Sequence, residues 1–215
     1  MHVIVLTGAG DRFFCAGANI DMLDAVTPTF KYHFCLHANE TLLRLEHTPK
    51  LVIAALNGHC VGGGLEVALA CDLRLAKRGG GKVGLPEVAL GVLPGTGGTQ
   101  RLARLLGKAR AMELMVSGRN MSFEDGLAQG LITRIIDAPD FRAAVVEEAR
   151  TFCPPAKAAL AVGLIKRSVQ SGAEIPLESG LALERELQAR LFSSDDARAG
   201  IAAYVAKEKP QFRGS

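Results

Sequence analysis

The sequence lacks the features that would place it in or across a membrane. None of its apolar runs approaches the roughly 18 residues that a membrane-spanning helix needs. The N-terminal stretch MHVIVLTGAGDR has neither the basic start nor the apolar core of a secretory signal. We therefore expect no membrane partner, and we expect the cytoplasm as the location of the protein.

The sequence also lacks a large excess of charge of either sign. The 25 Lys and Arg residues nearly balance the 22 Asp and Glu residues, which leaves a net charge of +3. The basic residues are scattered along the chain and form no stripe, so we expect no DNA partner and no RNA partner. A small anionic ligand remains compatible with this balance.

Paired cysteine motifs are absent as well. The five cysteines are Cys15, Cys35, Cys60, Cys71 and Cys153. Their odd number, their mostly apolar neighbours and the lack of a CxxC pair favour reduced thiols over disulfides or a zinc site. His33 and His37 have the spacing of two metal ligands on one helix face, but no acidic third ligand stands nearby, so we expect no metal.

The segments that are present predict an α/β protein. The runs HVIVLTG and LVIAALNG have the pattern of buried strands, and CDLRLAK adds a third. Helical patterns cover residues 29–47, a segment after the triple glycine, and residues 97–106, 108–117 and 123–129, with Ser122 and Asp125 as a capping box for the last. Beyond Pro154 and Pro155, helices are predicted at 156–171, 177–192 and 195–207. Alternating strands and helices followed by helices alone predict an α/β core with an α-helical C-terminal section.

The stretch VLTGAGDRF near the start resembles a dinucleotide fingerprint only in part. Gly8 and Gly10 follow a strand, but Phe13 stands where the third glycine is required for close packing of helix on strand. We therefore predict that these glycines form a loop.

The triple glycine in GHCVGGGLEVALACD lies where a strand and turn give way to a helix. The first N–H groups of a helix have no partner within it, so Gly62, Gly63 and Gly64 could bring a ligand oxygen against exposed backbone donors. The alternative is that the glycines merely allow tight packing of the helix.

Two carboxylates stand in apolar surroundings. Glu66 lies in a helix that is apolar all round, so its charged form is disfavoured unless it has a partner such as Arg or Lys or serves in proton transfer. Glu87 follows Pro86, which we place at a first helical position, and Glu87 could simply complement the helix dipole. Together, the two carboxylates form a set that can take one proton and give another.

These residues lie in motifs that resemble one family. FFCAGANIDML, NGHCVGGGLEVALACDLRLA and GLPEVALGVLPGTGGTQRLARLLGKARAMELMVSG resemble, in this order, the motifs of the enoyl-CoA hydratase/isomerase (crotonase) family, and the likeness continues through DARAGIAAYVAKEKPQF. The chain is most similar to the hydratase branch. The resemblance implies an α/β fold in which residues 1–138 form a spiral of ββα units and residues 139–215 form a helical trimerisation section.

The resemblance also implies roles for individual residues. The N–H groups of Ala18 and Gly63 would form an oxyanion hole, Glu66 and Glu87 would be the acid/base pair, and the N–H of Gly95 would place a water molecule. The implied substrate-binding positions are Ala16, Ala18, Ile20, Gly62, Gly63 and Lys207, although Lys207 could equally be a solvated helix end.

The activity implied in this way is the addition of water to trans-2-enoyl-CoA thioesters, which gives 3-hydroxyacyl-CoA in fatty-acid or related acyl-CoA catabolism. The substrate would be an acyl-CoA thioester and no cofactor would be needed, because coenzyme A is part of the substrate. A homotrimer or a hexamer built from two trimers is expected. Double-bond isomerisation within the same family and a catalytically weak homologue that binds acyl-CoA or RNA are the alternatives.

Two departures from the family pattern bear on the charge near the site and on the sheet. Asn19 stands where the family has an aspartate, which retains a polar cap but removes a charge. Family members also carry an additional segment ahead of HVIVLTG, so we expect an N-terminally shortened spiral core. The first strand of this core would then have an open edge that is normally paired.

Overall fold

The chain forms two compact units in the computed structural model, which describes residues 1–214. The larger unit contains Leu6–Leu45 and Ile53–Val145. The smaller unit contains Met1–Val5, Glu46–Val52 and the described residues from Val146 onward. The predicted boundary at residue 138 stays a prediction.

The first six strands of the described chain alternate between two sheets. Within residues 1–214 the strands are β1 (Val3–Thr7), β2 (Phe13–Cys15), β3 (Leu51–Leu56), β4 (His59–Val61), β5 (Leu73–Lys77), β6 (Lys82–Gly84), β7 (Met121–Ser122) and β8 (Arg134–Ile136). One sheet has the order β1-β3-β5-β8 and the other has the order β2-β4-β6-β7. Three times in succession, a pair of strands gives its first member to one sheet and its second to the other, which is the spiral of ββα units that we predicted.

Parallel pairing dominates both sheets. β3 pairs with β5, β5 with β8, β2 with β4 and β4 with β6 in parallel, whereas β6 and β7 are antiparallel. Parallel sheets are normally covered on both faces, and their strands then have continuous apolar sequences. β3 fits this pattern, since five of its six residues are buried.

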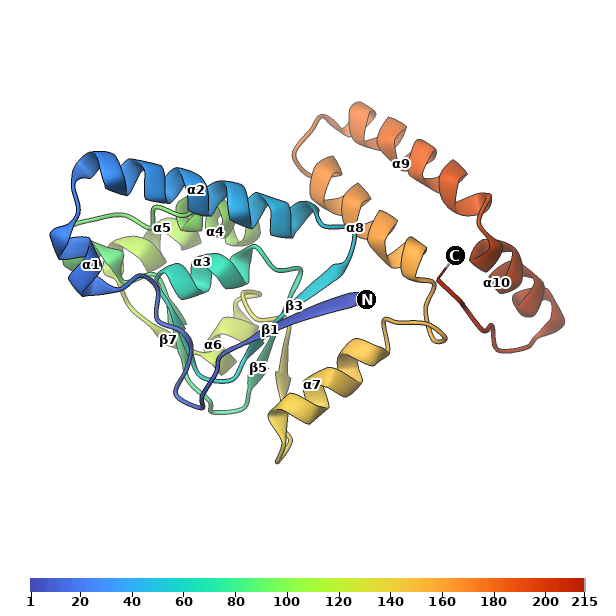
Figure 1. Ribbon diagram of the computed structural model, residues 1–215, viewed down its shortest axis with the longest axis horizontal. Coiled ribbons are helices and arrows are strands. Elements are labelled where there is room, and N and C mark those ends of the chain that lie inside the picture. The colour runs from blue at the N-terminus through green and yellow to red at the C-terminus, as the bar shows by residue number, and fades with distance from the viewer. Residues whose placement is uncertain (215) are drawn as a thin grey trace. The chain divides into compact units, whose positions relative to one another are not determined.

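The helices of the larger unit are α1 (Ile20–Ala25), α2 (Pro28–His47, which ends in the smaller unit), α3 (Gly63–Leu69), the 3-10 helix η1 (Glu87–Leu90), α4 (Gly98–Leu106), α5 (Lys108–Ser117) and α6 (Phe123–Ala128). Figure 1 shows α3 in the larger unit, where it is in contact with α4. The predicted cap of α6 is confirmed, because the Ser122 hydroxyl accepts a hydrogen bond from the N–H of Asp125 at 3.0 Å. The short helix α1 was not predicted, although the Asn19 side chain caps it by accepting from the N–H groups of Asp21 and Met22.

Gly8 and Gly10 lie in a loop, as predicted. The side chain of Asn57 holds this loop: its Oδ1 accepts from the N–H of Gly8 at 2.8 Å, and its Nδ2 donates to the carbonyl of Gly10. The glycines of this segment thus serve a turn that is fixed by the Asn-Gly corner after β3.

The helix α3 is surrounded by protein, as its sequence predicts. Leu65 and Ala68 are fully buried, and α3 packs against β2, β4 and α4. A β-carbon on Gly64 would lie 2.1 Å from the carbonyl oxygen of Cys15 in β2. The helix therefore approaches this strand more closely than any side chain at position 64 permits, and tight packing is the role of this one glycine of the triplet.

Arg74 ties the end of α3 to the segment before β8 from inside the protein. It is 7% exposed, and its guanidinium donates to the carbonyls of Leu131 at 2.7 Å, Cys71 at 2.9 Å and Ala68 at 3.3 Å. Burial lowers the pKa of Arg74, but these acceptors hold the charged form in place.

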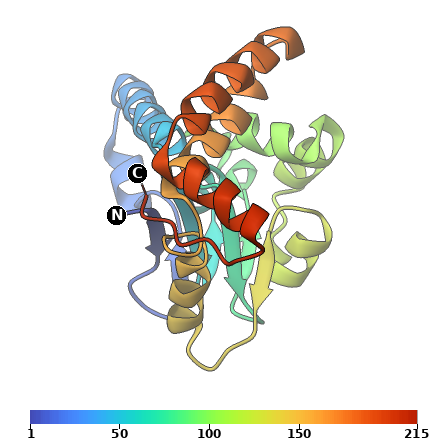
Figure 2. The ribbon, with the colours of Figure 1, turned by 90° about the vertical axis from the view of Figure 1, so that its right-hand side faces the viewer.

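The smaller unit is helical. The segment α7 (Phe141–Arg150) begins in the larger unit and leads to α8 (Ala159–Gly172), α9 (Leu177–Phe192) and α10 (Asp195–Ala206). Figures 1 and 2 show α8 and α9 side by side. The three predicted C-terminal helices are confirmed, and α7 was not predicted.

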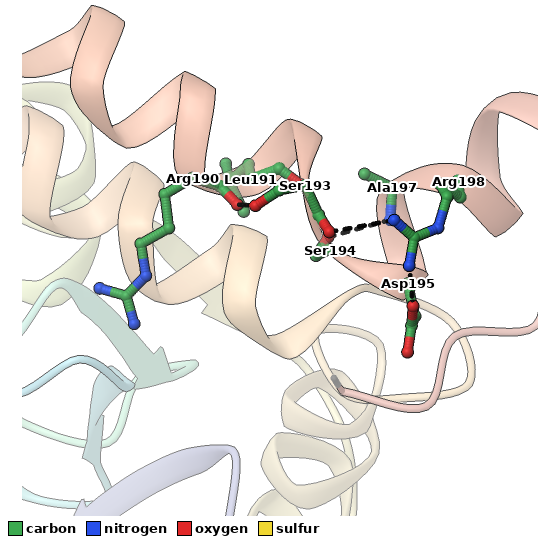
Figure 3. A network of polar contacts seen from close by, with 7 residues as sticks. All are labelled: Arg190, Leu191, Ser193, Ser194, Asp195, Ala197 and Arg198. Atoms are coloured by element: carbon green, nitrogen blue, oxygen red, sulfur yellow. Dashed lines mark hydrogen bonds and ion pairs between the residues drawn. The ribbon is translucent and has the colours of Figure 1, made fainter.

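The turn between α9 and α10 is closed by short-range polar contacts (Figure 3). The Ser194 hydroxyl donates to the carbonyl of Leu191 and accepts from the N–H of Ala197, so it ends one helix and caps the next. Arg198 then bonds both the carbonyl of Ser193 and the carboxylate of Asp195. No helix in the described part of the chain combines the length and the apolar character that crossing a membrane requires.

We predict that Gly64→Ala destabilises the protein, because the added methyl group would collide with the Cys15 carbonyl. Overpacking of this kind costs on the order of 1–3 kcal/mol in the free energy of unfolding. Urea denaturation of the wild type and of Gly64→Ala measures this difference in the free energy of unfolding. Gly10→Ala is the matched control, since no heavy atom lies within 4 Å of its β-carbon position. Equal stability of the two variants would contradict the prediction.

Candidate active site

Two backbone segments meet at the start of α3. Gly17, in the loop after β2, has φ 93°, and a β-carbon on it would lie 2.9 Å from the nitrogen of Gly63. A β-carbon on Gly63 would in turn lie 3.2 Å from Cα of Gly17 and 3.7 Å from the nitrogen of Ala18. Glycines at both positions therefore let the backbone at Gly17 and Ala18 come close to the start of α3.

Gly63 begins α3, so its N–H group has no acceptor within the helix. The preceding residue, Gly62, has φ 57°, a backbone angle that residues other than glycine rarely adopt. Two neighbouring N–H groups on rigid backbone can hold an oxygen atom on which negative charge develops.

Glu66 occupies the first turn of α3 and is only 3% exposed. Its Oε1 accepts hydrogen bonds from the N–H groups of Thr96 and Gly98, both at 2.8 Å. Its Oε2 accepts from the hydroxyl of Thr96. No Arg or Lys within residues 1–214 bonds this carboxylate, so the ion pair that the sequence left open is not formed, and neutral donors satisfy the buried charge instead.

The loop that supplies these donors is itself fixed. Gly97 has φ 109°, and its carbonyl accepts from the N–H of Arg101 at 2.9 Å, while the Arg101 guanidinium donates to the carbonyl of Thr96 at 3.2 Å. A β-carbon on Gly98 would lie 3.0 Å from Oε1 of Glu66. The glycines of PGTGG thus let the loop wrap closely around the carboxylate.

Glu87 is the second carboxylate near the start of α3. It is the first residue of η1, and Pro86 precedes this 3-10 helix, so our placement of Pro86 at a first helical position was wrong by one residue. Oε1 of Glu87 lies 3.2 Å from the position of a β-carbon on Gly62. Its Oε2 is buried and has no hydrogen-bond partner within the described residues.

The pKa of Glu87 is raised, first by burial and further by the negative charge of Glu66, while the N–H of Glu87 itself acts in the opposite direction. The two carboxylates are therefore close enough to interact but lie in different surroundings. One accepts three hydrogen bonds, and the other has a buried oxygen without a donor.

All of the predicted site residues except Lys207 lie in the larger unit. The carbonyl oxygen of Ala16 is 3.7 Å from the β-carbon position of Gly62, and the β-carbon position of Gly95 is 3.0 Å from Sγ of Cys35. Ile20 begins α1 and is 57% exposed. Lys207 belongs to the smaller unit, where it follows α10 with φ 57°.

Sequence reasoning missed Thr96 and Gly98 as donors to Glu66. Both residues lie in one of the motifs that carry the family resemblance, but their distance from Glu66 in the sequence gives no sign of a contact. The lone threonine inside a glycine run was the one available signal.

The chain belongs to the enoyl-CoA hydratase/isomerase family, since the sequence model of this family matches residues 1–215. The predicted family is thereby confirmed. Among curated relatives, a short-chain-enoyl-CoA hydratase of Clostridium acetobutylicum is 35% identical over 206 residues, which are 96% of this chain and 78% of the relative. A probable enoyl-CoA hydratase of Bacillus subtilis is 39% identical, with 98% of this chain and 81% of the relative covered.

Solved structures of similar proteins have the same fold. An enoyl-CoA hydratase of Geobacillus kaustophilus has a TM-score of 0.96 at 44% identity and covers 100% of this chain, which spans 81% of the other. The enoyl-CoA hydratase of Bacillus anthracis has a TM-score of 0.92 at 34% identity, with 100% of this chain and 82% of the other covered. The predicted crotonase-like α/β fold is confirmed.

We predict that Glu87→Gln becomes more stable relative to the wild type as pH rises. A carboxyl group whose pKa is raised by folding contributes stability below its ordinary pKa of 4.5 and loses it as pH rises through the folded value. Glutamine has no charge to bury, so the difference in free energy of unfolding should grow in favour of the variant between pH 4 and neutrality. Urea denaturation across this range measures it.

Glu124→Gln is the control with the opposite sign. The N–H of Gly79 donates to the exposed Glu124 carboxylate and lowers its pKa. Its stabilising contribution is present above the ordinary pKa of 4.5 and is lost as pH falls through the lowered value. This variant should therefore be less stable than the wild type at neutral pH and as stable as the wild type in acid. A pH-independent difference for Glu87→Gln would contradict the assignment of a raised pKa.

Proposed function

We propose that the chain hydrates trans-2-enoyl-CoA thioesters to 3-hydroxyacyl-CoA. The observation that carries the proposal is the pair of carboxylates, Glu66 and Glu87, which lie beside Gly63 and Gly62 but in different electrostatic surroundings. A hydration needs one group that takes a proton and one that gives a proton, and groups in contrasting surroundings suit these two roles. Relatives named as enoyl-CoA hydratases support the choice of reaction.

The thioester carbonyl oxygen would bind between the N–H groups of Ala18 and Gly63. When water adds to the β carbon, the electrons of the conjugated double bond move onto this oxygen and form an enolate. One preorganised donor at such an oxygen contributes about 3–4 kcal/mol to stabilisation of the transition state. The glycines at positions 17 and 63 are then required because the two donors must lie side by side.

Glu66 would act as the base. The three hydrogen bonds that its oxygens accept stabilise the charged carboxylate. This carboxylate can take a proton from water as the water oxygen bonds to the β carbon. The N–H of Gly95, next to the donor Thr96, would help to place this water molecule. Glu87, with its raised pKa, would hold a proton and deliver it to the α carbon. A proton returned from Glu66 to Glu87 restores both groups.

The remaining predicted contacts belong to the same proposal. Ala16, Ile20 and Gly62 would line the path of the thioester, and the ammonium of Lys207 would neutralise coenzyme A phosphates. No further cofactor takes part in this scheme. A homotrimer or a hexamer in the cytoplasm, with a role in fatty-acid or related acyl-CoA catabolism, completes the proposal.

Double-bond isomerisation is the second candidate, because the matched family is described by both activities and one relative, from Mycosarcoma maydis, is named an enoyl-CoA isomerase/hydratase at 35% identity. Isomerisation moves one proton between two carbons and can proceed with a single carboxylate. The presence of two carboxylates at the site favours hydration.

We expect the chain to remove the ultraviolet absorbance of the conjugated thioester when it is mixed with crotonyl-CoA. Glu66→Gln and Glu87→Gln should each lower kcat by about 10²–10⁴-fold, the usual contribution of a general acid or base. Glu124→Gln, an exposed carboxylate outside the site, should leave the rate unchanged. Hydration that survives both site substitutions would overturn the assigned roles.

The two candidate activities differ in their response to Glu66→Gln. This variant should lose hydration but retain transfer of a double bond from the 3 to the 2 position, which Glu87 can catalyse alone. Assay of a 3-enoyl-CoA with the same variant tests this. Equal loss of both activities would remove the distinction.

A further inference from the structure

The two oxygens of Glu66 are not equivalent. Oε1 accepts from two backbone N–H groups, those of Thr96 and Gly98. Oε2 accepts from the Thr96 hydroxyl and lies 3.8 Å from the position of a β-carbon on Gly63. The oxygen that the Thr96 hydroxyl holds is therefore one that lies near Gly63, the first residue of α3.

The Thr96 hydroxyl is directed at Oε2 by its surroundings. The N–H group of the same residue bonds Oε1, so Thr96 grips both carboxylate oxygens from one position. The Arg101 guanidinium holds the carbonyl of Thr96 at 3.2 Å. Branching at the β carbon restricts rotation of the threonine side chain. A backbone donor alone could not fix the second oxygen in this way.

We propose that Thr96 is a positioning residue for Glu66: its hydroxyl fixes the orientation of Oε2 and stabilises the charge there while water is activated. This inference rests on the proposed function and adds a residue to it. A carboxylate oxygen retains further acceptor capacity after one hydrogen bond, so Oε2 can accept from the reacting water as well. After proton transfer, the hydroxyl can turn and accept a hydrogen bond from the neutral acid, which a backbone N–H cannot do.

Thr96→Val and Thr96→Ser separate this role from packing. Valine has nearly the shape of threonine without the hydroxyl, whereas serine keeps the hydroxyl without the methyl group. Thr99→Val, in the first turn of α4, is a matched control for loss of a nearby threonine hydroxyl. Crotonyl-CoA hydration is measured for all three across pH.

Thr96→Val should lower kcat by about tenfold with a smaller change in KM, because one hydrogen bond to a charged group is lost. The acidic limb of its kcat profile should move to higher pH, since a carboxylate with fewer donors ionises less readily. Thr96→Ser should restore both properties, and Thr99→Val should match the wild type. An unchanged Thr96→Val, or a Thr96→Ser as impaired as Thr96→Val, would overturn the proposal.

Other titratable groups stay constant in this comparison. The elements packed against α3 carry Cys15 on β2, His59 and Cys60 on β4, and Arg101 and Arg104 on α4, and Glu87 of η1 interacts with Glu66. None of these is changed in the variants. A shift between Thr96→Val and Thr96→Ser therefore reports the hydroxyl.

A second measurement keeps this inference separate from the proposed reaction. If the wild type does not hydrate crotonyl-CoA, the proposed function fails in this assay, and the ionisation of Glu66 can still be followed by carbon-13 NMR of glutamate carboxyl groups. The Glu66→Gln variant assigns the signal. The midpoint should lie at higher pH in Thr96→Val than in the wild type or Thr96→Ser. Identical midpoints in all three proteins would overturn the role of Thr96.

Discussion

The burial of the Glu66 carboxylate is the constraint on which the rest of the site depends. A charge that is 3% exposed requires donors, and here they come from a loop thirty residues away in sequence, through the N–H groups of Thr96 and Gly98 and the hydroxyl of Thr96. This need accounts for the glycines around Thr96, because the loop must come close to the carboxylate. It also accounts for the brace that Arg101 supplies to the loop.

The same packing gives the second carboxylate its different character. Glu87 lies against Gly62 and interacts with Glu66, and its Oε2 has no hydrogen-bond partner within the described residues. Burial and the neighbouring charge therefore raise its pKa. The contrast between the two groups therefore comes from the unequal distribution of hydrogen-bond donors. Two identical side chains become suited to opposite directions of proton transfer in this way.

Much of the fold could be predicted because its signals are local. The apolar runs of β1, β3 and β5, the capping serine of α6 and the C-terminal helices were all recognised from short windows. The short strands β2, β4, β6 and β7 were missed, since two or three residues carry no periodicity, and their pairing with distant partners is what defines them. The helices α1 and α7 were also missed. For α1, six residues offer little pattern beyond the Asn19 cap.

The sequence by itself determined the family, the α/β class and the candidate roles of Glu66 and Glu87, because long motifs in a fixed order and a carboxylate in an apolar helix are visible without coordinates. Only the tertiary structure decided how the charge of Glu66 is satisfied. Sequence left a pairing with Arg or Lys open, whereas the folded chain uses neutral donors from Thr96 and Gly98. The physical reason is that hydrogen bonds between segments far apart in sequence depend on backbone positions that only the packing of α3, α4 and the intervening loop sets.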